Sequence, residues 1–217
     1  MKKISLAVLA LAFVASLAAT QAFAQMSAPA AAASADKTPP SYDMKAQSLL
    51  DLDTQNKKVI SLAEALPQDK FTWRPSPDAR SFAEVFLHIS GERYGILALG
   101  GARVPVAFAK DPEAYEKSTT DKTQIIAELK KSGDFMVATI TAMSNADFAR
   151  ALPSLGPDAN AGDVVYILVA DCHEHVGQLA AYARENGIVP PWTVAAQKAA
   201  KEAAEKKAAE EKEAKKQ

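Results

Sequence analysis

Apolar side chains recur every three or four residues in four separate stretches of this chain, as they do on one face of an α-helix. The stretches run from 44 to 66, from 81 to 99, from 121 to 143 and from 160 to 186. Almost nothing between them alternates in the manner of a strand. The pattern predicts an all-α domain in which four amphipathic helices bury one shared core, a four-helix bundle.

Helix-capping and helix-stopping residues fall between these stretches. Ser81 and Glu84 have the spacing of a capping box, in which each side chain accepts a hydrogen bond from the other residue's amide. The remaining boundaries are marked by Pro67, Gly100–Gly101, Thr120 or Asp121, Asn160 and Asn186–Gly187. The connection from 101 to 119 is long enough to cross the end of the bundle, so a simple up-down-up-down order does not follow.

The ends of the chain differ in composition from the predicted bundle. Lys2 and Lys3 precede an apolar run and the small-x-small site Ala22-Phe-Ala24, which is the pattern of a cleaved signal peptide. The next residues are rich in Ala, Ser and Pro, and the last ones are almost entirely Ala, Glu and Lys. We predict four segments: a signal peptide at 1–24, a flexible linker at 25–41, the bundle at 42–192 and a charged tail, helical or disordered, at 193–217.

A signal peptide implies export, to a periplasm or outside the cell. The apolar run is too short for a convincing membrane span, so we expect no stable membrane insertion after cleavage. Cys172 is the single cysteine, and the fold therefore depends on its apolar core rather than on an internal disulfide. The formal net charge of −1 becomes −3 when Lys2 and Lys3 are removed, and no basic stripe with interleaved aromatics is present. Nucleic acid is accordingly excluded as a partner.

The three histidines lie in two short segments with apolar neighbours, and imidazole is the commonest metal ligand in proteins. Asp171 and His175 are four residues apart and share one helix face. His173 and His175 are two apart and project roughly 200° from each other around a helix. Because His175 borders the apolar stripe, it is the histidine of this pair that we expect to point inward.

An inward Asp171 and His175, meeting His88 from another helix, would give one oxygen and two nitrogen ligands with open positions. Such a set is typical of a catalytic metal site. Glu92, one turn after His88, is a candidate fourth ligand or a base acting on bound water. The alternative is that these histidines are ordinary core residues that donate a ring proton to a carboxylate such as Asp171. The residues themselves leave both interpretations open.

Two segments taken together resemble the DinB-like superfamily. The first is Phe71-Thr-Trp-Arg-Pro-Ser-Pro with Arg80-Ser-Phe-Ala-Glu-Val-Phe-Leu-His88-Ile, and the second runs from Glu174-His175-Val-Gly-Gln to Gly187-Ile-Val-Pro-Pro. The resemblance covers residues 42–192. It implies a four-helix bundle in an up-down-down-up arrangement, which suits the long connection between the second and third helices.

The resemblance also implies a metal site, with one histidine on the second helix and two, four residues apart, on the last. By position these ligands are His88, Asp171 and His175, and this chain departs from the pattern in having Asp171 where histidine is usual. Aspartate still ligates zinc and suits harder ions. The expected cofactor is therefore a divalent ion: zinc, nickel or manganese.

Relatives of this kind include transferases and isomerases that use low-molecular-weight thiols, although export counts against a cytosolic thiol. We expect an exported metal-dependent hydrolase or transferase that acts on an unidentified small molecule. The alternatives are a non-catalytic exported binding or stress-associated bundle, and an interaction protein that uses the tail. A homodimer stays open, because no exposed apolar stripe in the sequence decides it.

Overall fold

The computed structural model describes residues 43–105, 108 and 110–214, so the predicted signal peptide and linker lie outside the described residues. Within that part of the chain the structure is helical, with one isolated β-bridge between Ala151 and Asn160. The four long helices of the bundle are α1 (Met44–Ala65), α2 (Phe82–Leu99), α5 (Lys122–Ala142) and α7 (Ala161–Glu185). Shorter elements occupy the connections, namely η1 (Gln68–Lys70), α4 (Pro112–Glu116) and α6 (Asn145–Phe148), and α8 (Pro191–Ala214) follows the bundle.

The helix boundaries agree with the capping signals in the sequence. The predicted capping box at the start of α2 is present, with the Glu84 amide 3.3 Å from Ser81 Oγ and the Ser81 amide 2.7 Å from Glu84 Oε2. Asp121 caps α5, and Asn160 caps α7. The all-α prediction and its four long helices are therefore confirmed, because local cap chemistry and apolar periodicity act in the same direction.

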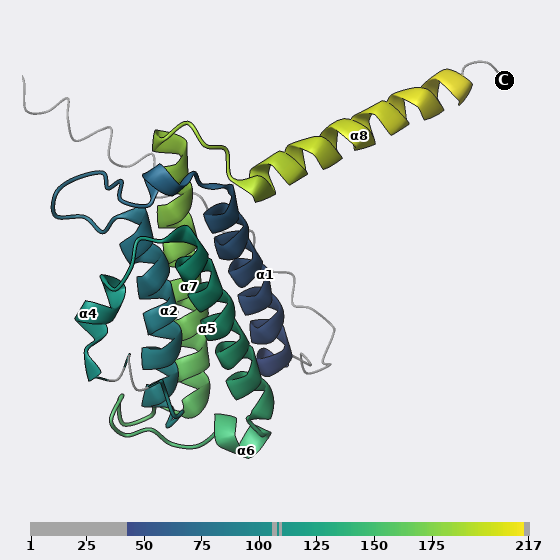
Figure 1. Ribbon diagram of the computed structural model, residues 1–217. Coiled ribbons are helices and arrows are strands. Elements are labelled where there is room, and N and C mark those ends of the chain that lie inside the picture. The colour runs from purple at the N-terminus through teal and green to yellow at the C-terminus, as the bar shows by residue number, and fades with distance from the viewer. Residues whose placement is uncertain (1–42, 106–107, 109, 215–217) are drawn as a thin grey trace, which may run out of the picture. The chain divides into compact units, whose positions relative to one another are not determined.

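The order of the helices follows from the long crossover. Figure 1 shows α1 and α7 running in one direction and α2 and α5 in the other, which is an up-down-down-up order. Both α1 and α2 pack against α5 and α7. The connection between α2 and α5 runs back along the bundle, and it carries α4 against α2.

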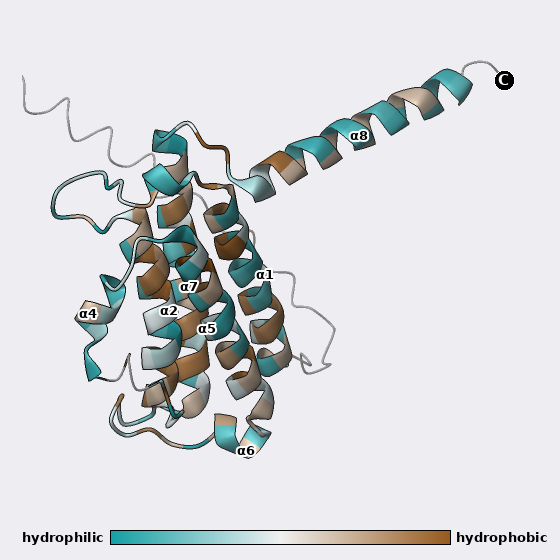
Figure 2. Cartoon of the chain, viewed as in Figure 1, coloured by the Kyte–Doolittle hydropathy of each residue, from teal (hydrophilic) through white to brown (hydrophobic). Residues whose placement is uncertain are grey.

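The core lies between the four long helices, whose buried residues are mainly apolar, and Figure 2 shows hydrophobic and hydrophilic residues alternating along these helices. One cluster of buried residues is aromatic and aliphatic and includes Phe71, Phe82, Phe86, Leu129 and Leu179. A second cluster, nearer the start of α7, includes Leu52, Leu97, Met136, Val165 and Cys172. Burial of this much apolar surface supplies most of the driving force for folding.

The predicted tail is helical as far as Ala214 within α8. Trp192 packs against the first core cluster, and every described residue from Val194 onward is exposed. Several Lys–Glu pairs four residues apart, such as Lys198 and Glu202, support the helix. None of the helices in the described residues has the length and apolar character needed to cross a membrane.

Candidate metal centre

Helices α2 and α7 bring together four ionisable side chains from distant parts of the sequence. His88 and Glu92 lie one turn apart on α2, and Asp171 and His175 lie one turn apart on α7. The two imidazole rings meet edge to face, with centroids 4.8 Å apart. The two histidines proposed from the sequence as ligands, His88 and His175, therefore lie together in the fold.

The Glu92 carboxylate lies between the two rings. Its Oε1 is 2.8 Å from His88 Nε2, and its Oε2 is 2.9 Å from His175 Nε2. Although His175 is so near, Oε2 is buried and forms no hydrogen bond of ordinary geometry with any described residue. One candidate ligand atom from each of these three residues lies within 4.8 Å of the others. Small side-chain rotations would let one ion with bonds of about 2.0–2.2 Å contact all three.

The other nitrogen of each ring has its own partner. His88 Nδ1 is 2.5 Å from Glu116 Oε1, and His175 Nδ1 is 2.9 Å from Gln178 Oε1. The amide of Gln178 is oriented by a bond from its Nε2 to the Tyr182 hydroxyl, at 3.2 Å. With a proton on Nδ1 of each ring, the two Nε2 lone pairs are left facing the Glu92 carboxylate, which is the arrangement metal-ligating histidines usually adopt.

Asp171 borders this group without lying between the rings. Its Oδ1 is 3.5 Å from His175 Nε2, and its side chain is 18 % exposed. The set His88, Asp171 and His175 stays a prediction, because the structure brings the two histidines together but places Glu92 nearer to both Nε2 atoms than Asp171. From the sequence, Glu92 was predicted only as a candidate fourth ligand or as a base acting on bound water.

The charges of the cluster are coupled. Burial lowers the pKa of His175, but Asp171, Glu92 and Gln178 outweigh it and raise that pKa to about 10. Burial likewise lowers the pKa of His88, and Glu92 and Glu116 reverse the effect, so this pKa is raised. Burial raises the pKa of Glu92, yet the contacts with His175 and His88 bring it far below its usual range. The metal-free cluster at neutral pH thus pairs an ionised Glu92 with a protonated His175.

The Asp171 carboxyl behaves in the opposite way from Glu92. Burial raises its pKa, His175 lowers it, and the neighbouring Glu92 raises it further, so the net pKa is raised. Two carboxyl groups side by side in a partly buried site resist being ionised together. Asp171 is accordingly the group of the cluster most ready to hold a proton.

His173 lies outside the cluster, as the helical spacing predicts. Its side chain is 52 % exposed, and its Nε2 is 2.8 Å from Asp51 Oδ2 on α1. This contact ties α7 to α1. His173 therefore serves as an internal comparison for the two clustered histidines.

The two residues that contact the Nδ1 atoms, Glu116 and Gln178, were not among the site residues predicted from the sequence. Gln178 lies three residues after His175, a spacing that puts the two on neighbouring turns of one helix. Glu116 comes from α4, and the signal that could have revealed this short helix is Asp111 followed by Pro112. The Asp111 side chain caps α4, and proline is favoured in the first helical position.

The structure also buries an arginine beside the cluster. Arg93 is 1 % exposed, and its Nη1 donates to the Leu129 carbonyl at 2.9 Å and to Ser132 Oγ at 3.1 Å. It adjoins Cys172, whose pKa is raised to about 11 by burial despite the guanidinium. Cys172 is thus an un-ionised core thiol, and a nucleophilic role does not fit it.

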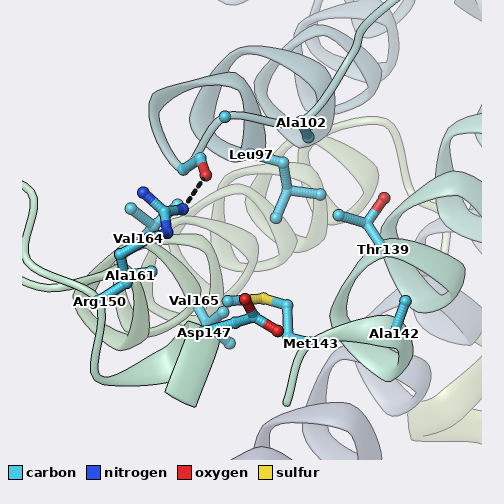
Figure 3. A pocket seen from close by; sticks show the side chains of 12 residues that line it. Leu97, Ala102, Thr139, Ala142, Met143, Asp147, Arg150, Ala161, Val164 and Val165 are labelled. Carbon is cyan, nitrogen blue, oxygen red and sulfur yellow. Dashed lines mark hydrogen bonds between the residues drawn. The ribbon is translucent and has the colours of Figure 1, made fainter. Parts of the chain in front are cut away.

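A separate hollow of about 220 Å³ lies where α2 and α5 end and α7 begins, and Figure 3 shows its lining. The walls are mainly apolar, with Leu97, Met143 and Val165 among them. Its two charged side chains are engaged within the protein: Arg150 donates to the Gly100 carbonyl, and Asp147 accepts from Ser144. None of the histidines lines this hollow.

Comparison with known proteins supports the same fold. The profile of the DinB superfamily matches residues 51–179. None of the curated proteins matches this chain.

Three solved structures are similar. A DinB-like protein from Bacillus cereus has a TM-score of 0.53 at 15 % identity, with 66 % of this chain and 93 % of that one covered. A DinB-like protein from Bacillus subtilis has a TM-score of 0.51 at 18 % identity, with 65 % and 92 % covered. A further Bacillus subtilis protein, YfiT, described as "a probable metal-dependent hydrolase with an unusual four-helix bundle topology", has a TM-score of 0.52 at 12 % identity, with 70 % and 95 % covered. At these identities the likeness establishes the fold.

Proposed function

This chain belongs to the DinB superfamily, and from that premise we propose that it binds one divalent metal ion through His88, Glu92 and His175. The observation that carries the proposal is the orientation of the two rings. Both Nδ1 atoms are held by acceptors outside the cluster, and both Nε2 atoms face the same carboxylate. If the two histidines only filled the core, their Nε2 atoms would not need to face the same Glu92 carboxylate.

The residues present fit a metal ion. Two imidazole nitrogens and one carboxylate oxygen suit zinc, nickel and manganese among the common divalent ions. Oε2 of Glu92, buried and without a regular hydrogen bond in the described residues, is an acceptor that an ion would satisfy. Asp171 is close enough to join as a further ligand through a change of side-chain rotamer.

We propose further that the protein is a metal-dependent hydrolase or transferase acting on a small molecule. A bound divalent ion would supply Lewis-acid polarisation of a substrate or of water. Asp171, with its raised pKa and its Oδ1 at 3.5 Å from His175 Nε2, is the side chain placed to take up or release a proton beside it. The description of YfiT as a "probable metal-dependent hydrolase" supports this direction.

Metal content tests the proposal directly. Protein purified without a histidine tag, stripped with chelator and then titrated with Zn²⁺, Ni²⁺ or Mn²⁺ should bind one ion per chain. His88→Ala, His175→Ala and Glu92→Ala should each lose it, whereas His173→Ala, which alters the exposed histidine of the same helix, should keep it. An intact fold with no bound ion would overturn the proposal.

A non-catalytic binding bundle is the second candidate, and one observation favours it. The cluster already has balanced charges without an ion, since Glu92 contacts both histidines and Glu116 contacts His88. In that case a purely structural polar network would link α2 to α7. The same titration separates the two candidates, because a structural network binds none of the three ions stoichiometrically.

A further inference from the structure

We infer that Glu116, on the short helix α4, is a positioning residue that sets the orientation of His88 for metal binding. This inference rests on the proposed metal site and concerns a residue from a different part of the chain than any of its ligands. The contact that carries it joins His88 Nδ1 to Glu116 Oε1 at 2.5 Å. A carboxylate on the outer nitrogen of a ligating histidine fixes the ring and raises the basicity of the inner nitrogen.

The Glu116 carboxylate is itself held in place. Arg80 Nε is 2.9 Å from Glu116 Oε2, and Arg80 Nη2 is 3.4 Å from Oε1. Arg80 directly precedes Ser81, the N-cap of α2, so the start of the histidine-bearing helix and His88 itself both contact the Glu116 carboxylate. With side-chain exposures of 14 % for His88 and 21 % for Glu116, this contact is partly shielded from water.

The crossover is packed so that α4 stays beside α2. The Tyr115 hydroxyl donates to Glu128 Oε1 on α5 at 2.7 Å. The ring of Phe108 lies against Gly91 and Gly95 of α2, where an added Cβ would come within 3.1 Å of ring atoms in each case. Two glycines, about one and two turns beyond His88, thus let the crossover approach α2 closely. This close approach places the Glu116 carboxylate beside the His88 imidazole.

The two histidines are supported unequally. His175 Nδ1 meets the amide oxygen of Gln178, whereas His88 Nδ1 meets a carboxylate oxygen of Glu116. A charged acceptor makes the stronger hydrogen bond, so Glu116 should contribute more to metal affinity than Gln178. Glu113, on the same helix, offers a matched comparison, because its side chain is 82 % exposed and its partner is Lys117.

The first test is the Zn²⁺ affinity of the full chain, measured by competition with a chromophoric chelator. Glu116→Ala should weaken binding by roughly 10–100-fold, and Glu116→Gln by less, because the amide keeps an acceptor. Glu113→Gln should stay within about twofold of the unmodified protein. A Glu116→Ala protein that retains its helical circular dichroism and binds Zn²⁺ as tightly as the unmodified chain would overturn the inference.

The second test does not need a metal. In metal-free protein at a pH where the ring is neutral, ¹⁵N NMR of His88 reports which nitrogen carries the proton. Loss of Glu116 should move the proton toward Nε2, beside Glu92, and Glu113→Gln should leave its position unchanged. If the unmodified chain binds no Zn²⁺, the proposed function fails while this measurement still decides whether Glu116 orients the ring. An unaltered proton position in Glu116→Ala refutes the positioning role.

Discussion

Raising the pH from about 7 to about 8.5 should destabilise the metal-free protein, because His175 holds its proton more tightly in the folded state than in the unfolded one. Its folded pKa is raised to about 10 from an ordinary value of 6.5. The stabilisation from this residue is complete below about pH 6.5 and is lost as the pH rises toward 10. In the chosen interval the folded state binds close to one more proton than the unfolded state.

The size of the effect follows from that single proton. The free energy of unfolding should fall by about 1.4 kcal/mol per pH unit, or about 2 kcal/mol over the interval. His88, whose pKa is also raised by Glu92 and Glu116 against burial, acts in the same direction. Burial raises the pKa of Cys172 to about 11. This thiol would affect the pH dependence of stability mainly above its ordinary pKa of 9, so the chosen interval ends below that pH.

The assay is urea unfolding followed by far-ultraviolet circular dichroism in the presence of a chelator. His175→Gln should lower the slope by about 1.4 kcal/mol per pH unit and leave the part contributed by His88, and His173→Gln, on the exposed side of the same helix, should preserve the full slope. A slope below about 0.5 kcal/mol per pH unit in the unmodified chain, or an equal slope in His175→Gln, would refute the assignment of a buried, protonated imidazole.

Three further predictions concern the scaffold. Ser81→Ala should cost about 1 kcal/mol of unfolding free energy through loss of the α2 capping box, whereas Ser144→Ala, at the N-cap of the four-residue α6, should have less effect. Equal losses in thermal melts would contradict this. Arg93→Met should be neutral or stabilising, by at most about 1–3 kcal/mol, because Nε and Nη2 of the buried guanidinium have no hydrogen-bond partner in the described residues. Destabilisation in urea would show that the bonds of Nη1 to Leu129 and Ser132 outweigh this cost. Deleting the exposed residues after Thr193 should change the unfolding free energy by less than about 0.5 kcal/mol, as measured by the same denaturation. A larger loss would mean that the part of α8 beyond Thr193 stabilises the bundle.

The bundle was predictable because its signals are local. Apolar periodicity, the Ser81–Glu84 capping box and the caps at Asp121 and Asn160 each concern residues a few positions apart. The inward direction of His175 and the outward direction of His173 follow from helix geometry together with the apolar stripe that His175 borders. These features could be predicted from the sequence without knowing how the helices pack.

The immediate surroundings of the histidines were harder to predict, since they depend on which side chains meet across the fold. Asp171 and Glu92 are both one turn from a histidine, and only the packing of α2 against α7 places Glu92 between the two rings. Glu116 belongs to a five-residue helix in an irregular crossover, and such a helix is too short to show a periodic pattern of apolar residues. A resemblance to a family with a histidine triad also drew attention to Asp171, because that is where the third histidine would be.

The measurement that tests the central claim most directly is anomalous X-ray diffraction from crystals of the full chain grown with Zn²⁺. We predict one strong anomalous peak about 2.0–2.2 Å from Nε2 of His88, Nε2 of His175 and an oxygen of Glu92, with Glu116 still on His88 Nδ1. A peak at His173 and Asp51 instead, or none between α2 and α7, would contradict the account.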